Sequence, residues 1–254
     1  MANPPYRFLT VLADGMEIAS GCHLRLTGSD SLSLRPGFFL LKAWDLSPSS
    51  AAVLSVARTL EVRSGHSTLA AGKICDVHTH ILQGKQITEV GFSTGLTLWE
   101  SSVSLSLSAG IRLSDAVRQI LKASGTGIQL VGFTGREMAF SRGQAFFGRA
   151  ASALESLAAA ADAFPWLSPA GLVLTGKSDR TVTLYLPADH LLSAPTAADH
   201  RILLSTAMVG WPSGAYVRYA WPGSAGEGRI LSRSLDADNE SGPWKSELMI
   251  LTDP

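Results

Sequence analysis

The stretch that decides the fold is Val103-Ser104-Leu105-Ser106-Leu107-Ser108-Ala109-Gly110, which leads directly into the segment 113–123. Apolar and serine side chains alternate in it, and a period of two is typical of a half-buried β-strand. Ser114 is placed to cap a following helix and Gly125 to end it. The helix then has one apolar stripe, formed by Val117, Ile120 and Leu121. A strand followed at once by an amphipathic helix predicts an α+β segment in the middle of the chain.

The residues before this segment show a different sequence pattern. Short apolar runs separated by Gly, Ser, Pro and Asp predict strands, of which examples are Arg7–Leu12, Phe38–Asp45, Ile74–Leu82 and Leu98–Leu107. Several short strands at this spacing favour a barrel or a sandwich. Residues 1–107 are therefore expected to form a first β domain.

A second helix is expected from Gln144 to Ala163, with Pro165 ending it. Its buried face would consist of Phe147, Ala150, Ala151, Leu154, Leu157 and Ala161. Strands are expected after it at Gly171–Thr175 and Thr181–Leu186. Together with the first helix, these elements define an α/β segment over residues 108–186.

The last region, residues 187–254, returns to strands. They are expected at Ile202–Met208, Gly214–Ala220, Gly228–Leu235 and Trp244–Leu251. Pairs such as Trp211-Pro212 and Pro222-Gly223 mark the turns between them. The fold class is therefore α+β and mainly β: a β domain at 1–107, a small α/β insertion at 108–186 and a second β domain at 187–254.

The composition is that of a chain able to bury packed cores, since 46% of its 254 residues are hydrophobic and 17% are charged. Its 21 basic and 21 acidic side chains cancel, which removes any bulk attraction to nucleic acid or membranes. Cys22 and Cys75 stand outside any CxxC spacing and fit a reducing compartment. Residues 1–10 lack the apolar stretch of a secretory signal, and no apolar run approaches the roughly 20 residues of a membrane helix. A protein made in the cytoplasm, without a membrane segment, is expected.

The strongest sign of enzymatic chemistry is Asp76-Val77-His78-Thr79-His80. On a strand Asp76, His78 and His80 would share one face, and these ligand types at this spacing can bind a divalent metal. The string resembles the opening His-x-His motif of amidohydrolase barrels, which need about 250 residues in an eightfold (β/α) arrangement. No regular βα alternation follows it, and His190 and His200 stand in no recognisable strand-end context. A metal-dependent hydrolase is the alternative hypothesis, and a polar strand face is the favoured one.

The cysteines do not form a catalytic pattern. Cys22 and His23 are neighbours, which on a strand point to opposite sides. Cys75 lies near His78 in sequence, and a lone Cys and His in a strand are typical of a core pair. The loop Gly125-Thr126-Gly127 follows a helix and precedes a strand, which is the wrong order for a dinucleotide site.

The C-terminal acids and tryptophans each allow a functional and a structural interpretation. Asp236, Asp238 and Glu240 lack the spacing of a calcium loop and favour a turn. The tryptophans, which are Trp211, Trp221 and Trp244, suit either a ligand platform or structural wedges in small barrels and interfaces. No catalytic, cofactor-binding or metal-binding residue is therefore expected, and the chain is not expected to be an enzyme.

Several segments, taken in their order along the chain, form a recognisable pattern. In the first two thirds they are Arg35–Ser47, Val103–Gly110 with the helix Leu113–Ala123, and Phe147–Ala163 with Trp166 and Gly171–Leu174. In the last third they are Leu191–Pro195, Trp211–Val217, and Arg229–Leu235 with Asp238–Trp244. This order resembles the baseplate or tail hub proteins of tailed phages and related injection machines. Asp45 stands where that family commonly has Asn, and residues 48–100 match poorly.

The resemblance implies two tail-tube-like β-barrels, at 1–107 and 187–254, joined by a small α/β insertion. It implies a homotrimer whose barrels form a pseudo-sixfold ring at the tail tip of a virion, around the channel through which DNA leaves. The implied partners are the tail tube or distal tail protein, the tape-measure protein and a central spike or fibre protein, with no cofactor. A balanced charge suits a channel that must not hold DNA. A carbohydrate-binding tail module, with Trp211, Trp221 and Trp244 as sugar platforms, is a further alternative.

Overall fold

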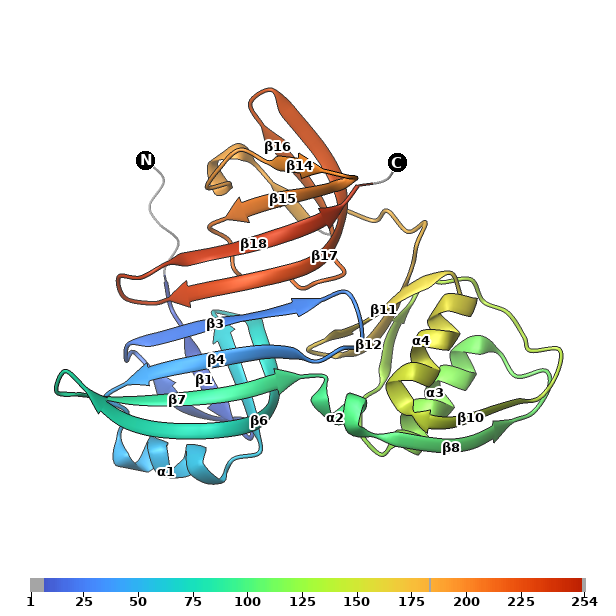
Figure 1. Cartoon of the computed structure of the whole chain (residues 1–254), viewed down its shortest axis with the longest axis horizontal. Helices are drawn as coiled ribbons and strands as arrows, with labels where there is room; N and C mark the ends of the chain where they lie inside the picture. The colour runs from blue at the N-terminus through green and yellow to red at the C-terminus, as the bar shows by residue number, and fades with distance from the viewer. Residues whose placement is uncertain (1–6, 183, 253–254) are drawn as a thin grey trace. The chain divides into compact units, whose positions relative to one another are not determined.

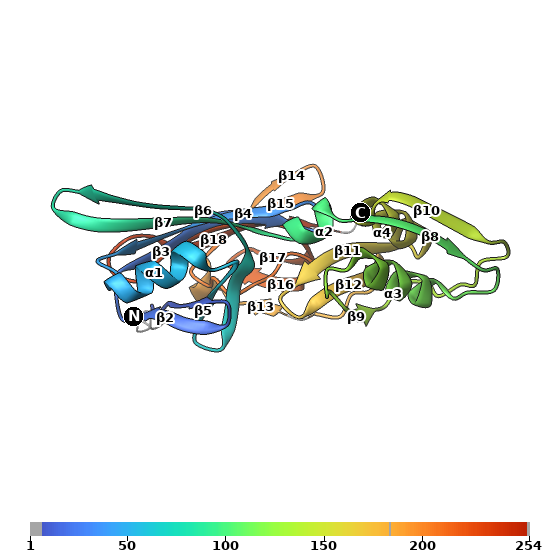
Figure 2. The ribbon, with the colours of Figure 1, turned by 90° about the horizontal axis from the view of Figure 1, so that it is seen from below.

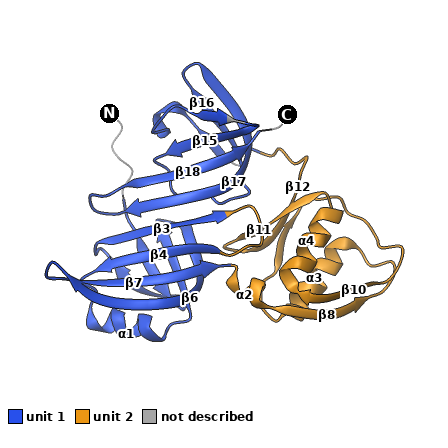
Figure 3. Cartoon of the chain, in the orientation of Figure 1, with its two compact units in different colours: residues 1–30, 37–94, 182–254 blue, residues 31–36, 95–181 orange. Residues whose placement is uncertain are grey.

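A computed structural model of the chain describes residues 7–182 and 184–252 (Figure 1). The N-terminal residues 1–6, part of the stretch in which no secretory signal was expected, lie outside these ranges. The chain divides into two compact units (Figure 3): unit 1 is 1–30, 37–94 and 182–254, and unit 2 is 31–36 and 95–181. None of the described helices is long and apolar enough to cross a membrane.

Unit 1 is built almost entirely of strands. Its first part contains β1 (Thr10–Ala13), β2 (Met16–Ser20), β3 (Leu24–Ser31), β4 (Gly37–Trp44), helix α1 (Pro48–Val56), β5 (Thr59–Ser64), β6 (Ser67–Leu82) and β7 (Lys85–Thr94). Its second part contains β13 (Leu184–Leu186), the 3-10 helix η1 (Ala188–His190), β14 (Thr196–Ala198), β15 (Arg201–Thr206), β16 (Tyr216–Trp221), β17 (Ser224–Asp238) and β18 (Trp244–Leu251). All of these strands belong to one 13-stranded sheet with the main order β14-β15-β18-β17-β3-β4-β7-β6-β5-β1-β2.

The sheet bends into two layers. In Figure 2 the strands β15, β18, β4, β7 and β6 follow the upper side of unit 1, and β2, β5, β13 and β16 lie below them. Side chains between the layers form two cores. Leu26, Leu41, Val62 and Phe92 belong to the first, and Leu186, Leu204, Val217 and Ile250 to the second. Strands β17 and β18 serve both, because Leu235 and Trp244 lie in the first core while Ile230 and Leu248 lie in the second.

The upper layer consists of two strand groups with the same internal order. One group is β3-β4-β7-β6 and the other is β14-β15-β18-β17, and they follow one another in the sheet because β17 pairs with β3. In each group the first two strands form a hairpin, the last two form another, and the second strands of the two hairpins pair with each other. Strand β6 therefore corresponds to β17, β7 to β18, β4 to β15 and β3 to β14.

A shared irregularity supports this correspondence. The pairing of β6 with β7 shifts between Ile74 and Asp76, and the pairing of β17 with β18 shifts between Ile230 and Ser232. One residue is thus extra in each long strand, which is the definition of a β-bulge. Because a bulge is positioned by its surroundings, its recurrence shows that the two groups repeat each other in register.

Unit 2 holds the helices of the middle segment. Its elements are α2 (Leu96–Glu100), β8 (Ser102–Leu107), α3 (Leu113–Ser124), β9 (Leu130–Phe133), β10 (Gln144–Arg149), α4 (Ala150–Ala160), β11 (Ala163–Ser168) and β12 (Gly171–Gly176). Strands β8 and β10 form one small sheet and β11-β12-β9 another. The third core lies here and includes Val117 and Ile120 of α3 and Leu154 and Leu157 of α4.

The expected α+β, mainly β fold class is confirmed, but four local expectations are wrong. Residues 144–149 form β10 and not the start of a helix, because they pair with β8, and only 150–160 are helical. Phe147, which was expected on the buried face of that helix, is 93% exposed. Pro165 lies inside the edge strand β11, a position that proline tolerates. The strand expected at Leu98–Leu107 begins only at Ser102, since Leu96–Glu100 is helix α2.

The fourth wrong expectation concerns the start of α3. Its N-cap is Arg112, and Ser114 instead donates its backbone N–H to the Glu137 carboxylate at 3.2 Å. Gly125 ends the helix in the left-handed conformation, as expected. The domain boundaries 1–107, 108–186 and 187–254 stay a prediction. The two compact units divide the chain differently, since residues 31–36 belong to the same unit as 95–181.

Candidate functional site: the junction of the two strand groups

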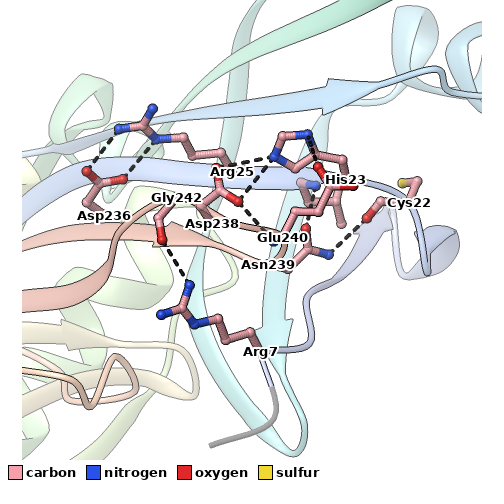
Figure 4. Close-up of polar contacts among 10 residues, drawn as sticks. Arg7, Cys22, His23, Arg25, Asp236, Asp238, Asn239, Glu240 and Gly242 are labelled. Atoms are coloured by element: carbon pink, nitrogen blue, oxygen red, sulfur yellow. Dashed lines mark hydrogen bonds and ion pairs between the residues drawn. The ribbon is translucent and has the colours of Figure 1, made fainter. Parts of the chain in front are cut away.

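The junction is the place where the end of β17 and the turn after it meet the start of β3 (Figure 4). Asn239 fastens the two segments by three hydrogen bonds. Its side-chain Oδ1 accepts from Leu24 N at 2.8 Å, its Nδ2 donates to Cys22 O at 2.9 Å, and its backbone N donates to Leu24 O at 3.1 Å. Arg7 adds a bond from Nη1 to Gly242 O at 2.9 Å. The turn is therefore held to β3 by backbone groups as well as side chains.

His23 lies at the centre of this junction. Its ring stacks on Trp44 with 3.8 Å between centroids and 9° between planes. Its Nε2 lies 3.2 Å from both carboxylate oxygens of Asp238, and its Nδ1 lies 3.1 Å from Glu240 Oε2. One ring nitrogen thus faces the carboxylate at the end of β17, and the other faces a carboxylate in the turn that follows.

Asp238 is the most buried acid of the junction, with 5% of its surface exposed. Burial by itself raises the pKa of its carboxyl. Hydrogen bonds from the backbone of Glu240, from His23 and from the backbone of Gly242 lower the pKa by more than burial raises it, so the net pKa lies below its ordinary value. The folded state therefore favours the charged form of this carboxylate.

Charged side chains continue from the junction across the outer face of the sheet. Arg25 forms two bonds to Asp236, from Nε to Oδ1 at 2.9 Å and from Nη2 to Oδ2 at 3.0 Å. Arg25 lies opposite Lys42 in the register, Lys42 opposite Glu89, and Glu89 opposite His78. Since residues directly opposite share a face, a row of charged and polar groups crosses β17, β3, β4, β7 and β6.

Most of this row is paired internally. Lys42 Nζ lies 2.7 Å from Glu89 Oε1, and this hydrogen bond holds the pKa of Glu89 below its usual value. On β18, Lys245 contacts Glu247 at 2.9 Å on the same outer face. The positive charges of Arg25, Lys42 and Lys245 are each matched by a carboxylate at contact distance.

A second polar contact joins the two groups beneath the sheet. The Arg233 guanidinium of β17, which is 4% exposed, pairs with the Asp30 carboxylate and donates to Leu69 O at 2.9 Å. Ser213 Oγ donates to the same carboxylate at 2.5 Å. Arg233 also lies over the Phe39 ring, 5.7 Å from its centroid. A buried charge is thus fixed between residues from both strand groups.

The residues of the metal-ligand hypothesis lie on β6. Asp76, His78 and His80 do share one face, as expected, since they lie opposite Gly91, Glu89 and Ile87 on β7. Asp76 Oδ2 contacts His78 Nε2 at 2.8 Å, and both side chains are well exposed. Within residues 7–182 and 184–252, no group of three or more His, Cys, Asp or Glu is arranged to hold a metal ion.

The remaining candidates are dispersed. Cys75 Sγ contacts Lys73 O at 3.6 Å, and Cys22 packs against the first core, where burial raises the pKa of its thiol. Trp244 lies in the first core, whereas Trp211 and Trp221 pack against the second. The sequence interpretation of Asp236 and Asp238 as turn residues is wrong, because both lie in β17, which ends at Asp238. It also missed the contact of Asp238 with His23, because more than 200 residues separate the partners.

The sequence matches no protein-family model, and no curated protein matches it significantly. Solved structures do match. A tail protein from Neisseria meningitidis MC58 is 13% identical with a TM-score of 0.72, covering 97% of this chain and 96% of its own. The 43 kDa tail protein of prophage MuSo2 from Shewanella oneidensis is 12% identical with a TM-score of 0.70, covering 97% and 100%.

A third similar structure comes from E. coli. The c3393 protein, a component of the type VI secretion system with structural similarity to T4 tail proteins gp27 and gp5, is 9% identical with a TM-score of 0.66. It covers 96% of this chain and 77% of its own. Identities this low show the fold alone. The resemblance found in the sequence is confirmed at that level: this chain has the fold of bacteriophage and prophage tail proteins.

Proposed function

We propose that this chain is a structural component of a phage tail or a related injection device, and within it the hub of the tail tip. The observation that carries the proposal is the pair of strand groups repeated in register within one unit. A chain that presents the same sheet twice can match a partner of higher rotational symmetry with fewer copies of itself. Three copies would present six equivalent groups, as a hub between a hexameric tube and a threefold tip requires.

The charged row on the outer face gives this proposal an electrostatic basis. Unpaired Lys and Arg side chains bind DNA phosphates and release counterions, so they would slow the passage of DNA through a channel. Arg25, Lys42 and Lys245 each contact a carboxylate on this face. The outer face of the sheet is therefore suited to line the exit channel of the proposed trimer.

The rest of the hub hypothesis belongs to the same proposal. The two cores of unit 1 correspond to two tail-tube-like barrels, and unit 2 to the α/β insertion. One side of the ring would bind the tail tube or distal tail protein and the other a central spike or fibre protein, in a virion assembled from protein made in the host cytoplasm. The tape-measure protein and DNA would pass through the centre, and neither a cofactor nor a catalytic residue takes part.

Native mass spectrometry of the full chain, with bound metal read in the same spectra, tests the proposal. We expect metal-free trimers, and ring-shaped particles in electron micrographs of the same sample. A monomer that carries stoichiometric divalent metal, lost in the His78→Ala, His80→Ala double variant, would contradict the hub and support the hydrolase. Saccharide binding that is lost on Trp211→Ala would instead support a carbohydrate-binding module.

A further inference from the structure

Three polar side-chain atoms in the interior of unit 1 find no hydrogen-bond partner among the residues that the structure describes. They are Trp211 Nε1, Arg233 Nε and Ser246 Oγ. Ser246 is fully buried, and Arg233 is 4% exposed. Buried polar groups in native proteins nearly always have a partner, which is an ordered water molecule where the protein itself supplies none. These three atoms therefore indicate an internal binding site.

Two of the atoms come from neighbouring positions of one sheet face. Arg233 of β17 lies directly opposite Leu248 of β18, and Ser246 stands two residues before Leu248. Arg233 and Ser246 are thus diagonal neighbours on the inner face, a separation of about 7–8 Å that a long side chain can reach across. On β18, Trp244 belongs to the first core and Leu248 to the second. The polar atoms therefore lie at the boundary between the two cores.

The repeated strand groups show what Ser246 lacks. Counting from the shared bulge, Thr79 and Thr88 of the first group correspond to Leu235 and Ser246 of the second, and each pair is directly opposite across its hairpin. In the first group, Thr79 Oγ1 lies 3.2 Å from Thr88 Oγ1, so one hydroxyl donates to the other. In the second group the corresponding partner is a leucine, which can neither donate nor accept. The buried hydroxyl of Ser246 therefore needs a partner from outside the protein chain.

Arg233 cannot turn to satisfy its own Nε. Its Nη2 atom pairs with the Asp30 carboxylate and donates to Leu69 O at 2.9 Å. Its guanidinium also lies over the Phe39 ring. These contacts fix the plane of the guanidinium, so a rotation that gave Nε a new acceptor would break the bonds of Nη2.

We infer that unit 1 binds an ordered water molecule at the boundary between its two cores, held by Arg233 Nε and Ser246 Oγ. Arg233 Nε donates to the water oxygen, and the water donates in turn to Ser246 Oγ. Trp211 Nε1 supplies a further donor from the same region, because Ser213 of the same segment bonds to Asp30, the partner of Arg233. A buried water typically makes about three hydrogen bonds, which these three atoms can provide.

The charges at the site favour water over an ion. The carboxylate of Asp30 already matches the positive charge of Arg233. A bound anion would add an unmatched negative charge to a buried place, which is strongly unfavourable, and the donors Arg233 Nε and Trp211 Nε1 would repel a cation. A neutral molecule that both accepts and donates satisfies Nε and Oγ together.

The sign of a stability change tests the site. In Ser246→Ala the water loses a partner, so we expect the equilibrium constant of unfolding in urea to rise about 2- to 10-fold, as on the loss of one hydrogen bond. Ser93→Ala is the matched control, because Ser93 is also fully buried and its hydroxyl donates to Gly37 O at 2.9 Å. If Ser246 Oγ had no partner, Ser246→Ala would remove a buried unpaired hydroxyl. An unchanged or lowered constant for Ser246→Ala, beside a raised one for Ser93→Ala, would overturn the inference.

A crystal structure of the full chain that resolves ordered water provides the direct measurement. We expect a density peak within hydrogen-bond distance of Arg233 Nε and Ser246 Oγ, and its loss in Ser246→Val, whose methyl groups occupy the space of the water. A direct bond from Ser246 Oγ to a protein group without such a peak would overturn the inference. A peak with the anomalous signal of chloride would overturn water in favour of an anion. The hub proposal is independent of these outcomes, because the site lies inside a single chain.

Discussion

Gly72 and Gly228 occupy the same position in the two strand groups, and each lies against the backbone of the neighbouring strand. A Cβ atom would lie 2.2 Å from Ser93 O at Gly72 and 2.2 Å from Leu251 O at Gly228. Both glycines precede the bulge of a long strand, where that strand passes from one neighbour to another. The backbones approach too closely there for any side chain, so glycine is required at both positions.

Gly228→Ala is expected to destabilise unit 1 because its Cβ meets backbone that has no room to move. Overpacking of this kind costs about 1–3 kcal/mol, measured as the change in the free energy of unfolding in urea. Gly91→Ala is the matched control, since a Cβ there would meet its nearest atom at an ordinary 3.9 Å. Equal losses in the two variants would contradict the close approach.

Asp238→Asn is expected to change the pH dependence of stability. The carboxyl of Asp238 has a lowered pKa in the folded chain, so the folded state binds fewer protons than the unfolded one, and stability is lost as pH falls through the acid range. The variant lacks this contribution, so its free energy of unfolding should be lower at pH 7 and should fall less between about pH 5 and pH 3. Asp115→Asn, on the exposed face of α3, serves as the control.

The contact of Arg233 with Asp30 should show strong coupling in a double-mutant cycle. Asp30→Asn leaves a buried guanidinium without its counter-charge, which costs about 3–5 kcal/mol. Adding Arg233→Met removes that charge and should recover part of the loss. Thermal or urea unfolding of the two single variants and the double variant measures the coupling, and additive effects would show that the ion pair contributes little.

Truncation of Phe146 and truncation of Phe147 should differ in their effect on stability. Phe146 packs against the core of unit 2, and Phe147, its neighbour in β10, is 93% exposed. Phe146→Ala should destabilise the chain by up to about 3 kcal/mol because it opens a cavity in a core. Phe147→Ala should leave the melting temperature unchanged. If Phe147→Ala were the more destabilising variant, the buried and exposed faces of β10 would be the reverse of those in the structure.

Removing the acids of the outer face should create a DNA-binding surface. The triple variant Glu89→Gln, Asp236→Asn, Glu247→Gln releases the three positive charges that these acids now contact. We expect it to retain duplex DNA in a gel-shift assay at low salt and to release it as salt rises, whereas the native chain does not bind. The charge-conserving variant Glu89→Asp is the control. DNA retention by the native chain would contradict the proposed channel face.

The sequence predicted the elements whose signal is local. Strand β18 runs from Trp244 to Leu251 as expected, because its side chains alternate along the whole strand. Helix α3 was recognised from its apolar stripe and from Gly125. Residues 144–149 were assigned to a helix because the alanines after them extend the helical period, and only their pairing with β8 makes them a strand.

The junction could not be predicted in this way. His23 and Asp238 are brought together by the pairing of β17 with β3. No local sequence pattern predicts a contact between residues so distant in sequence. The resemblance indicated two similar halves but not their register. The bulges at Cys75 and Leu231 carry that information, and they become visible only when the strands are paired.

The long strands β6 and β17 also have a mechanical consequence. Each passes without a break from a neighbour in one layer to a neighbour in the other, over 16 and 15 residues. Hydrogen bonds between antiparallel strands run across the strand direction, so a pull along such a strand loads many of them in shear at the same time. Tension applied at one layer would therefore reach the other through covalent backbone, and the unit would resist stretching as one body.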